Sequence, residues 1–225
     1  NVLFAFHRLS IIGIKSTGNQ PLKHPFDQSL TLICNGEIYN YKILAKKYDF
    51  NLQTGSDCEI ILHMFKKFGI KKTVEELDGV FMFVLHDAQS NLLYASRDPF
   101  GVRPGFIGYD NDEIYLSSEA KPLVKFCSKI IPFKPGSYWC SNDINNFIGF
   151  YKLDFQNNNK LDSIYKNVNT LLTEAVIKRL MADREIGCLL SGGLDSSLIA
   201  ALVSKFYKGK RLKTFSIGMP GSIDL

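Results

Sequence analysis

The sequence lacks any apolar run long enough to cross a membrane, and its start lacks the pattern of a signal peptide. It has no dense run of basic residues, and a net charge of +5 over 225 residues argues against nucleic acid as a partner. The five cysteines form no CxxC pair, and the four histidines lack the spacing of zinc ligands. We therefore expect neither a membrane nor a nucleic-acid partner. The odd, unpaired cysteines indicate a reducing compartment, the cytoplasm.

The sequence does contain enough apolar material for a core, because 45% of its residues are hydrophobic and 22% are charged. The length predicts one large or two small domains. Strand patterns dominate before the polar, aperiodic segment 156–160, and a helical period follows it. We predict two domains, residues 1–158 and residues 159–225.

The first predicted domain is rich in strands. Apolar runs predict strands over 2–6 and 29–34, the second ending at Asn35-Gly36. Ser56 and Glu59 have the spacing of a capping box and predict a helix start. Paired runs around turn residues predict three hairpins, at 80–96, 105–117 and 137–151.

The second predicted domain alternates between helix and strand. A helical period over 164–180 leads to a strand over 186–190, a helix from 198 and a strand over 213–218. This order predicts the start of a parallel, doubly wound sheet.

A short loop between the strand and the second helix has the most specific sequence in the chain. It reads Ser191-Gly192-Gly193-Leu194-Asp195-Ser196-Ser197. A strand, a Gly/Ser loop and a helix N-terminus direct backbone N–H groups at an anion, and glycines allow a phosphate to approach closely. The Walker pattern GxxxxGK[ST] is absent. The loop instead resembles the pyrophosphate-binding loop of N-type ATP pyrophosphatases, which implies transfer of AMP to a carboxylate.

Both ends of the chain fall beside apolar, strand-like runs, and the first residue is Asn1 rather than methionine. We therefore expect this chain to be an internal part of a longer protein.

Three further motifs lie in the first domain, at 7–11, 35–40 and 54–57. Taken singly, each has an ordinary explanation. Arg8 can be a surface cation, Asn35-Gly36 a hairpin turn, and Asp57 a residue that stabilises a helix start.

Together with 97–104 and 118–121, these motifs resemble the glutaminase domain of amidotransferases that use an N-terminal cysteine. With the loop at 191–197, the resemblance narrows to the glutamine-hydrolysing asparagine synthetase family and covers the whole chain. It implies an α+β sandwich of the N-terminal-nucleophile glutaminase type (αββα), followed by the start of an α/β doubly wound parallel sheet. It also implies asparagine synthesis from aspartate and glutamine through β-aspartyl-AMP.

The resemblance assigns roles in the first domain. Arg8 would bind the α-carboxylate of glutamine and Asp57 its ammonium, with Glu37 helping to position the substrate. The Asn35 amide and the Gly36 N–H would stabilise the oxyanion. The pocket lining would comprise Leu9, Ser10, Ile11 and Ile12. The family's nucleophilic cysteine is not in this chain, so we expect the chain alone to be inactive.

Roles in the second domain follow in the same way. ATP and its pyrophosphate would contact Leu190, Ser191, Gly192, Gly193, Leu194, Asp195, Ser196, Ser197 and Ile217. Asp195 is the candidate Mg²⁺ ligand; its alternative role is to stabilise the helix N-terminus. We expect glutamine, aspartate and ATP as ligands and a homodimer as the assembly.

Three alternatives stay open. An amidophosphoribosyltransferase would share the glutaminase half but lack the 191–197 loop. A β-lactam-synthetase-like enzyme would keep both halves, lose the glutaminase nucleophile and adenylate another carboxylate, although Arg8, Asn35, Gly36 and Asp57 are all present. A catalytically silent homologue would bind glutamine or nucleotide without turnover. The residues that precede and follow this chain would discriminate among them.

Overall fold

The computed structural model describes residues 2–111, 113–153, 161–209, 211–219 and 221. The chain divides into two compact units, Asn1–Asp154 and Phe155–Leu225. The predicted boundary between residues 158 and 159 and the polar segment 156–160 lie outside the described residues.

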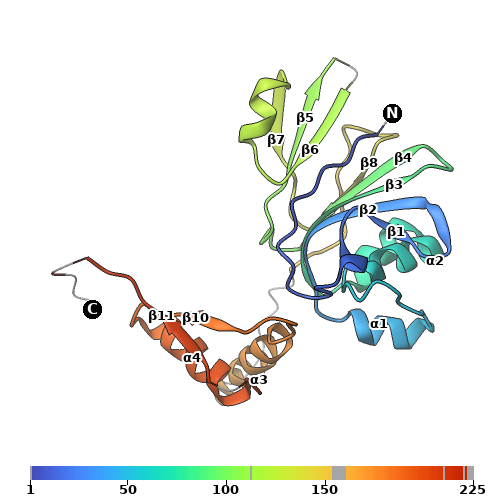
Figure 1. Ribbon diagram of the computed structural model, residues 1–225. Coiled ribbons are helices and arrows are strands. Elements are labelled where there is room, and N and C mark those ends of the chain that lie inside the picture. The colour runs from blue at the N-terminus through green and yellow to red at the C-terminus, as the bar shows by residue number, and fades with distance from the viewer. Residues whose placement is uncertain (1, 112, 154–160, 210, 220, 222–225) are drawn as a thin grey trace. The chain divides into compact units, whose positions relative to one another are not determined.

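The first unit contains two antiparallel sheets (Figure 1). The larger sheet has the order β1-β2-β3-β4-β8-β9, with strands Leu22–His24 (β1), Asp27–Ile38 (β2), Gly79–Asp87 (β3), Leu92–Arg97 (β4), Ser137–Cys140 (β8) and Ile148–Gly149 (β9). The smaller sheet has the order β6-β5-β7, with strands Phe106–Asp110 (β5), Glu113–Ser117 (β6) and Lys129–Pro132 (β7).

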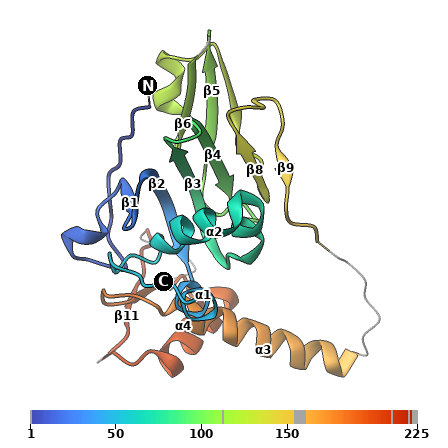
Figure 2. The ribbon, with the colours of Figure 1, turned by 90° about the vertical axis from the view of Figure 1, so that its right-hand side faces the viewer.

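The larger sheet is covered differently on its two faces. Helix α2 (Glu59–Glu76) crosses one face, as Figure 2 shows, and the Phe65 ring lies 4.8 Å from that of Tyr94. The neighbouring residue Ala95 points the other way, into a core built around Trp139 that includes residues of both sheets. A shorter helix, α1 (Tyr41–Tyr48), and two 3₁₀ turns, η1 (Ser16–Gly18) and η2 (Lys121–Lys125), complete the unit.

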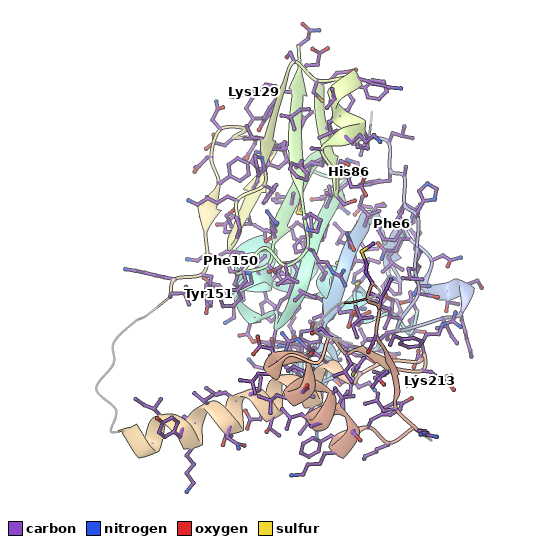
Figure 3. The ribbon with its side chains drawn as sticks, turned by 90° about the vertical axis from the view of Figure 1, so that its left-hand side faces the viewer. Phe6, His86, Lys129, Phe150, Tyr151 and Lys213 are labelled. Atoms are coloured by element: carbon purple, nitrogen blue, oxygen red, sulfur yellow. The ribbon has the colours of Figure 1, made fainter. Side chains whose placement is uncertain are left out.

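The three predicted hairpins are confirmed as antiparallel pairs β3–β4, β5–β6 and β8–β9. Figure 3 labels Phe150 and Tyr151, which follow β9; the Tyr151 ring makes an edge contact with Phe100 at 5.6 Å. The strand predicted over 2–6 is wrong, because this segment pairs with no strand. Its apolar pattern serves side-chain packing instead: Phe4 contacts the Trp139 core, while Leu3 is 94% exposed.

The capping box predicted at Ser56 is also wrong. Helix α2 begins at Glu59, and its N-cap residue, Cys58, makes no side-chain cap. The Ser56 hydroxyl accepts a hydrogen bond from the Cys58 N–H at 3.3 Å, so it supports the turn before the helix. The Glu59 carboxylate turns back to the preceding loop, where it accepts hydrogen bonds from Gln53 and Thr54.

The second unit has two helices, α3 (Leu161–Arg179) and α4 (Leu194–Phe206), and two strands, β10 (Gly187–Leu189) and β11 (Lys213–Phe215). The strands are parallel, with Cys188 opposite Thr214, so the predicted start of a parallel sheet is confirmed. Lys213, labelled in Figure 3, forms an ion pair with Glu185 at 2.6 Å. Among the described residues, none of the helices combines the length and apolarity that crossing a bilayer requires.

Candidate active site

Two segments of the first unit that are distant in sequence meet at a pair of glycines. Gly13 and Gly55 have φ values of 64° and 74°. A Cβ on Gly13 would lie 2.7 Å from the carbonyl carbon of Gly55, so only glycine allows this approach. The Thr17 hydroxyl donates to the Thr54 carbonyl at 2.9 Å. The segment that contains Arg8 therefore lies beside the segment that contains Asp57.

The second half of β2 contacts both segments through its free edge, the edge that faces away from β3. The Gln20 side chain accepts the Cys34 N–H at 2.6 Å and donates to the Cys34 carbonyl at 2.9 Å. Four residues further along, the Ile38 N–H donates to Asp57 Oδ2 at 2.7 Å. Because alternate residues of a strand direct their N–H groups to the same side, the Gly36 N–H points to this edge, between the other two.

Asn35 and Gly36 lie within β2, so the hairpin-turn alternative is wrong and the strand extends beyond its predicted end. Gly36 lies opposite Phe81 of β3. The Phe81 N–H donates to the Asp98 carboxylate at 3.2 Å, and its carbonyl accepts the Asp98 N–H at 2.8 Å. Since both backbone groups of Phe81 face away from β2, the Gly36–Phe81 pair is of the non-hydrogen-bonded type. This agrees with a Gly36 N–H directed to the open edge.

Replacing Gly36 by alanine is expected to separate β2 from β3. A Cβ there would lie 2.2 Å from the Val80 carbonyl oxygen and 2.6 Å from Phe81 Cα, both in backbone that cannot rotate away. Forced overpacking typically costs about 1–3 kcal/mol, and we expect a loss at the upper end of this range in urea unfolding. The matched variant Gly149→Ala, with its nearest atom at 4.0 Å, should change little. An equal, small effect at both positions would contradict this packing argument.

Arg8 is held by its own segment. Its Nη2 donates to the carbonyls of Ile12 and Gly13, both at 2.8 Å, and its Nη1 lies 3.4 Å from Asn19 Oδ1. These bonds use part of the five-donor guanidinium and fix its plane, which leaves further N–H groups for a carboxylate. The other predicted lining residues differ in exposure: Leu9 is 89% exposed, Ser10 and Ile11 are half-buried, and Ile12 is buried.

Asp57 is a buried carboxylate with an unusual proton affinity. Burial raises its pKa to about 6, the Ile38 N–H bond opposes this rise, and the nearby charge of Glu37 adds to it. Two carboxylates near the edge of β2 thus form an environment that favours a cation. An ammonium group bound there would lower the pKa of Asp57 again.

The segment 97–104 is organised in a way that the sequence did not reveal. The adjacent opposite charges of Arg97 and Asp98 predict a structural ion pair, and this prediction is wrong, because the two side chains bind separate backbone groups. The Arg97 guanidinium donates to the carbonyls of Gly101, Arg103 and Phe133 at 2.6–2.8 Å. The fully buried Asp98 carboxylate accepts backbone N–H groups from the same loop, including that of Arg103 at 3.0 Å.

Both backbone groups of Arg103 are thereby fixed, and its Nη2 lies 3.6 Å from Glu37 Oε1. This contact was missed because residues 37 and 103 are far apart in sequence and neither carries a recognisable motif for the pair. It places a positive charge beside the predicted substrate-positioning carboxylate.

The second unit presents its loop beyond the carboxyl ends of β10 and β11. Gly192 has a φ of 85°, and Gly193 is the N-cap of α4. The Ser196 hydroxyl lies 3.0 Å from Ser191 Oγ and 3.2 Å from the Gly193 carbonyl. The first helical N–H groups, from residue 194 onward, have no partner within the helix, as at any helix start, and Asp195 is in this first turn.

Leu190 follows directly after β10, and Ile217 comes two residues after the end of β11. The Leu190 N–H donates to the Phe215 carbonyl at 2.8 Å, and the Ser216 hydroxyl donates to the Leu190 carbonyl at 2.5 Å. Ile217 is fully exposed. The structure thus brings the residues of the predicted ATP site to one end of this sheet, the end at which ligands bind in such folds. No cluster of three metal-ligating side chains occurs in the part of the chain that the structure describes.

Comparison with known proteins identifies the protein family to which the chain belongs. A family model described as a glutamine amidotransferase domain matches residues 1–184, and the chain therefore belongs to that family. A solved amidotransferase, the glutamine phosphoribosylpyrophosphate amidotransferase from B. subtilis, superposes with a TM-score of 0.52. It is 19% identical, and the match covers 88% of this chain and 48% of that chain. At this identity the likeness concerns the fold alone, and it confirms the predicted α+β class.

Within the family, the similarity is to asparagine synthetases. An asparagine synthase family model matches residues 167–225. The glutamine-hydrolyzing asparagine synthetase of Homo sapiens is 40% identical over all of this chain and 46% of its own length. The probable enzyme of Acanthamoeba polyphaga mimivirus is 37% identical over all of this chain and 45% of its own length. This chain thus spans less than half of these relatives.

Proposed function

We propose that the protein containing this chain makes asparagine from aspartate, ATP and glutamine through a β-aspartyl-AMP intermediate. One observation carries the proposal: similarity to glutamine-hydrolyzing asparagine synthetases covers all of this chain, through both matched families. Such a protein is a carbon–nitrogen ligase with glutamine as its amido donor.

In the first unit, the edge of β2 is the proposed glutamine site. Asp57, with Glu37 nearby, would receive the substrate ammonium, and the anchored guanidinium of Arg8 would pair with its carboxylate. The Gly36 N–H and the Asn35 amide would donate to the oxyanion that forms when the side-chain amide is attacked. The proposal is supported by the edge-directed N–H of Gly36 and by the raised pKa of Asp57.

In the second unit, the loop at 191–197 is the proposed pyrophosphate site. The N–H groups at the start of α4 and the serine hydroxyls would hold the leaving pyrophosphate while AMP passes to the acceptor carboxylate. Leu190 and Ile217 would flank the nucleoside. Mg²⁺ usually binds phosphates together with one or two carboxylates, and exposed Asp195 beside the loop could supply one.

The proposal also covers the domain boundaries, the oligomeric state and the cellular location. We propose functional domains at residues 1–158 and 159–225, a homodimer, and residence in the cytoplasm. The last agrees with five cysteines that are all free. Sedimentation of the intact protein tests the homodimer, which a monomer at micromolar concentration would contradict.

A coupled assay of the intact protein tests the activity. With aspartate, Mg²⁺-ATP and glutamine, we expect equal amounts of AMP, pyrophosphate, asparagine and glutamate. With ammonia in place of glutamine, asparagine should still form, because only the first unit handles glutamine. Glutamine binding without AMP release would instead favour the catalytically silent homologue, and AMP release without asparagine would favour a ligase for another acceptor.

A further inference from the structure

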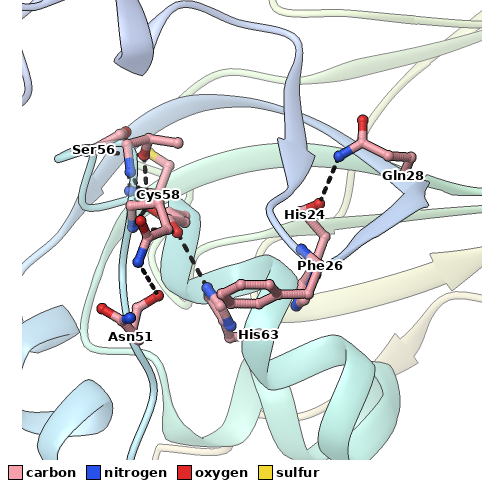
Figure 4. Close-up of polar contacts among 10 residues, drawn as sticks. His24, Phe26, Gln28, Asn51, Ser56, Cys58 and His63 are labelled. Atoms are coloured by element: carbon pink, nitrogen blue, oxygen red, sulfur yellow. Dashed lines mark hydrogen bonds and ion pairs between the residues drawn. The ribbon is translucent and has the colours of Figure 1, made fainter.

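A fully buried carboxylate, Glu59, stands behind the loop that precedes Asp57. Its Oε2 accepts the Thr54 N–H at 2.6 Å and the Thr54 hydroxyl at 2.7 Å. Its Oε1 lies 2.8 Å from the Gln53 nitrogen and 3.2 Å from His63 Nε2. His63, labelled in Figure 4, reaches the carboxylate from the next turn of α2.

The carboxylate is charged despite its burial. Burial alone would raise the pKa of Glu59, but the hydrogen bonds from His63, Thr54 and Gln53 more than offset this, and its pKa is lowered. Neighbouring rings hold His63, the partner of Glu59, in place. The His63 ring stacks on that of Phe50, with ring centroids 5.2 Å apart, and its centroid lies 4.6 Å from that of His24. A buried ion held this way fixes the backbone that binds it.

The loop fixed by Glu59 is the one that positions the glutamine site. Thr54, held through its N–H and hydroxyl by Glu59, also accepts the Thr17 hydroxyl through its carbonyl. Gly55 follows it and packs on Gly13, and Asp57 comes two residues later. The chain of contacts from Glu59 thus reaches both sides of the site, although its own hydrogen bonds go to Gln53, Thr54 and His63.

We propose that Glu59, supported by His63, is a positioning residue that sets the place of Asp57 and of the Arg8 segment for glutamine binding. The inference rests on the proposed function of this site. It accounts for a buried charge in the first turn of α2 that contacts no predicted substrate-binding residue.

Glu59→Gln tests the proposal with little change in volume. Each carboxylate oxygen accepts at least one backbone N–H, so either orientation of the amide places an NH₂ group against a donor. We expect the amide protons of Gln53 and Thr54 to exchange faster, while those of β3 stay protected. We also expect the carboxyl of Asp57, followed by NMR titration, to titrate at lower pH as its burial is lost. Glutamine affinity should fall at least about tenfold.

The matched control is Glu75→Gln, which makes the same change in α2 beyond its break at Gly69, at a residue whose ion pair with Lys71 is 4.0 Å long. It should leave all three measurements unchanged. Unaltered Asp57 titration and unaltered Thr54 exchange in Glu59→Gln would overturn the proposal. Absence of glutamine binding by the unsubstituted chain would count against the proposed function instead, because the titration and exchange measurements do not depend on ligand.

Discussion

Replacing Asp57 by asparagine is expected to raise the free energy of unfolding by about 3 kcal/mol at pH 8 and to abolish glutamine binding. The carboxyl binds its proton with a pKa of about 6 in the folded chain, against 3.8 as the ordinary value, chiefly because it is buried. The folded chain therefore binds more protons than the unfolded chain between these values. Stability due to this group is present below pH 3.8 and is lost as the pH rises through 6.

Asparagine cannot ionise, so the variant avoids the cost of a buried charge, and its side-chain oxygen can still accept the Ile38 N–H. Urea unfolding can be followed by the fluorescence of Trp139, the one tryptophan of the sequence, which is fully buried in the first unit. The advantage of the variant should shrink toward zero at pH 4, which provides an internal control. A destabilised variant at pH 8 would contradict the argument.

The same carboxylate is expected to make the proposed binding of glutamine dependent on pH. An ammonium ligand pairs with the ionised form, so the affinity of the unsubstituted chain should fall as the pH drops below about 6. Calorimetric titration with glutamine from pH 5 to pH 8 measures this. A flat profile would exclude Asp57 as the ammonium ligand.

Replacing Asp98 by alanine is expected to destabilise the first unit by roughly 3–5 kcal/mol. The carboxylate is 1% exposed and accepts four backbone N–H groups, from Phe81 (3.2 Å), Phe100 (3.1 Å), Val102 (2.9 Å) and Arg103 (3.0 Å). Alanine leaves these donors without an acceptor. The loop that fixes Arg103 beside Glu37 should then become mobile.

Unfolding in urea followed by Trp139 measures the loss. Asp143→Ala is the matched control, since it removes the same charge from an exposed turn where the carboxylate accepts a bond from Asn146. Its cost should stay within about 0.5 kcal/mol. A loss below about 1 kcal/mol for Asp98→Ala would show that water replaces the carboxylate.

The hairpins, the order of the elements and the parallel pair of the second unit could be predicted, because each depends on local alternation and turn residues. The site could be predicted only as separate motifs. Nothing near Arg8 in the sequence indicates that Gly13 packs on Gly55, because that contact depends on how two loops meet. Likewise, Glu59 has the spacing of a capping box, yet its carboxylate binds Gln53 and Thr54 because folding places that loop within reach.

Arg97 and Asp98 illustrate the same limit. Opposite charges at adjacent positions suggest a pair, but neighbouring residues of a strand point to opposite faces, which separates them. Asp98 follows directly after β4, and the two side chains bind backbone groups on different sides of the loop. Each charged side chain thus holds backbone groups of the loop, and the two do not form an ion pair with each other.

The free edge of β2 also bears on how this protein avoids association. An unpaired strand edge invites a strand from another chain, and proteins usually block such edges. Here Gln20 and Asp57 occupy the N–H groups of Cys34 and Ile38, so an incoming strand would find its regular donors already taken. Between them, the Gly36 N–H is directed to the same edge. The side-chain contacts that flank the proposed glutamine site therefore also disfavour pairing with a strand of another chain.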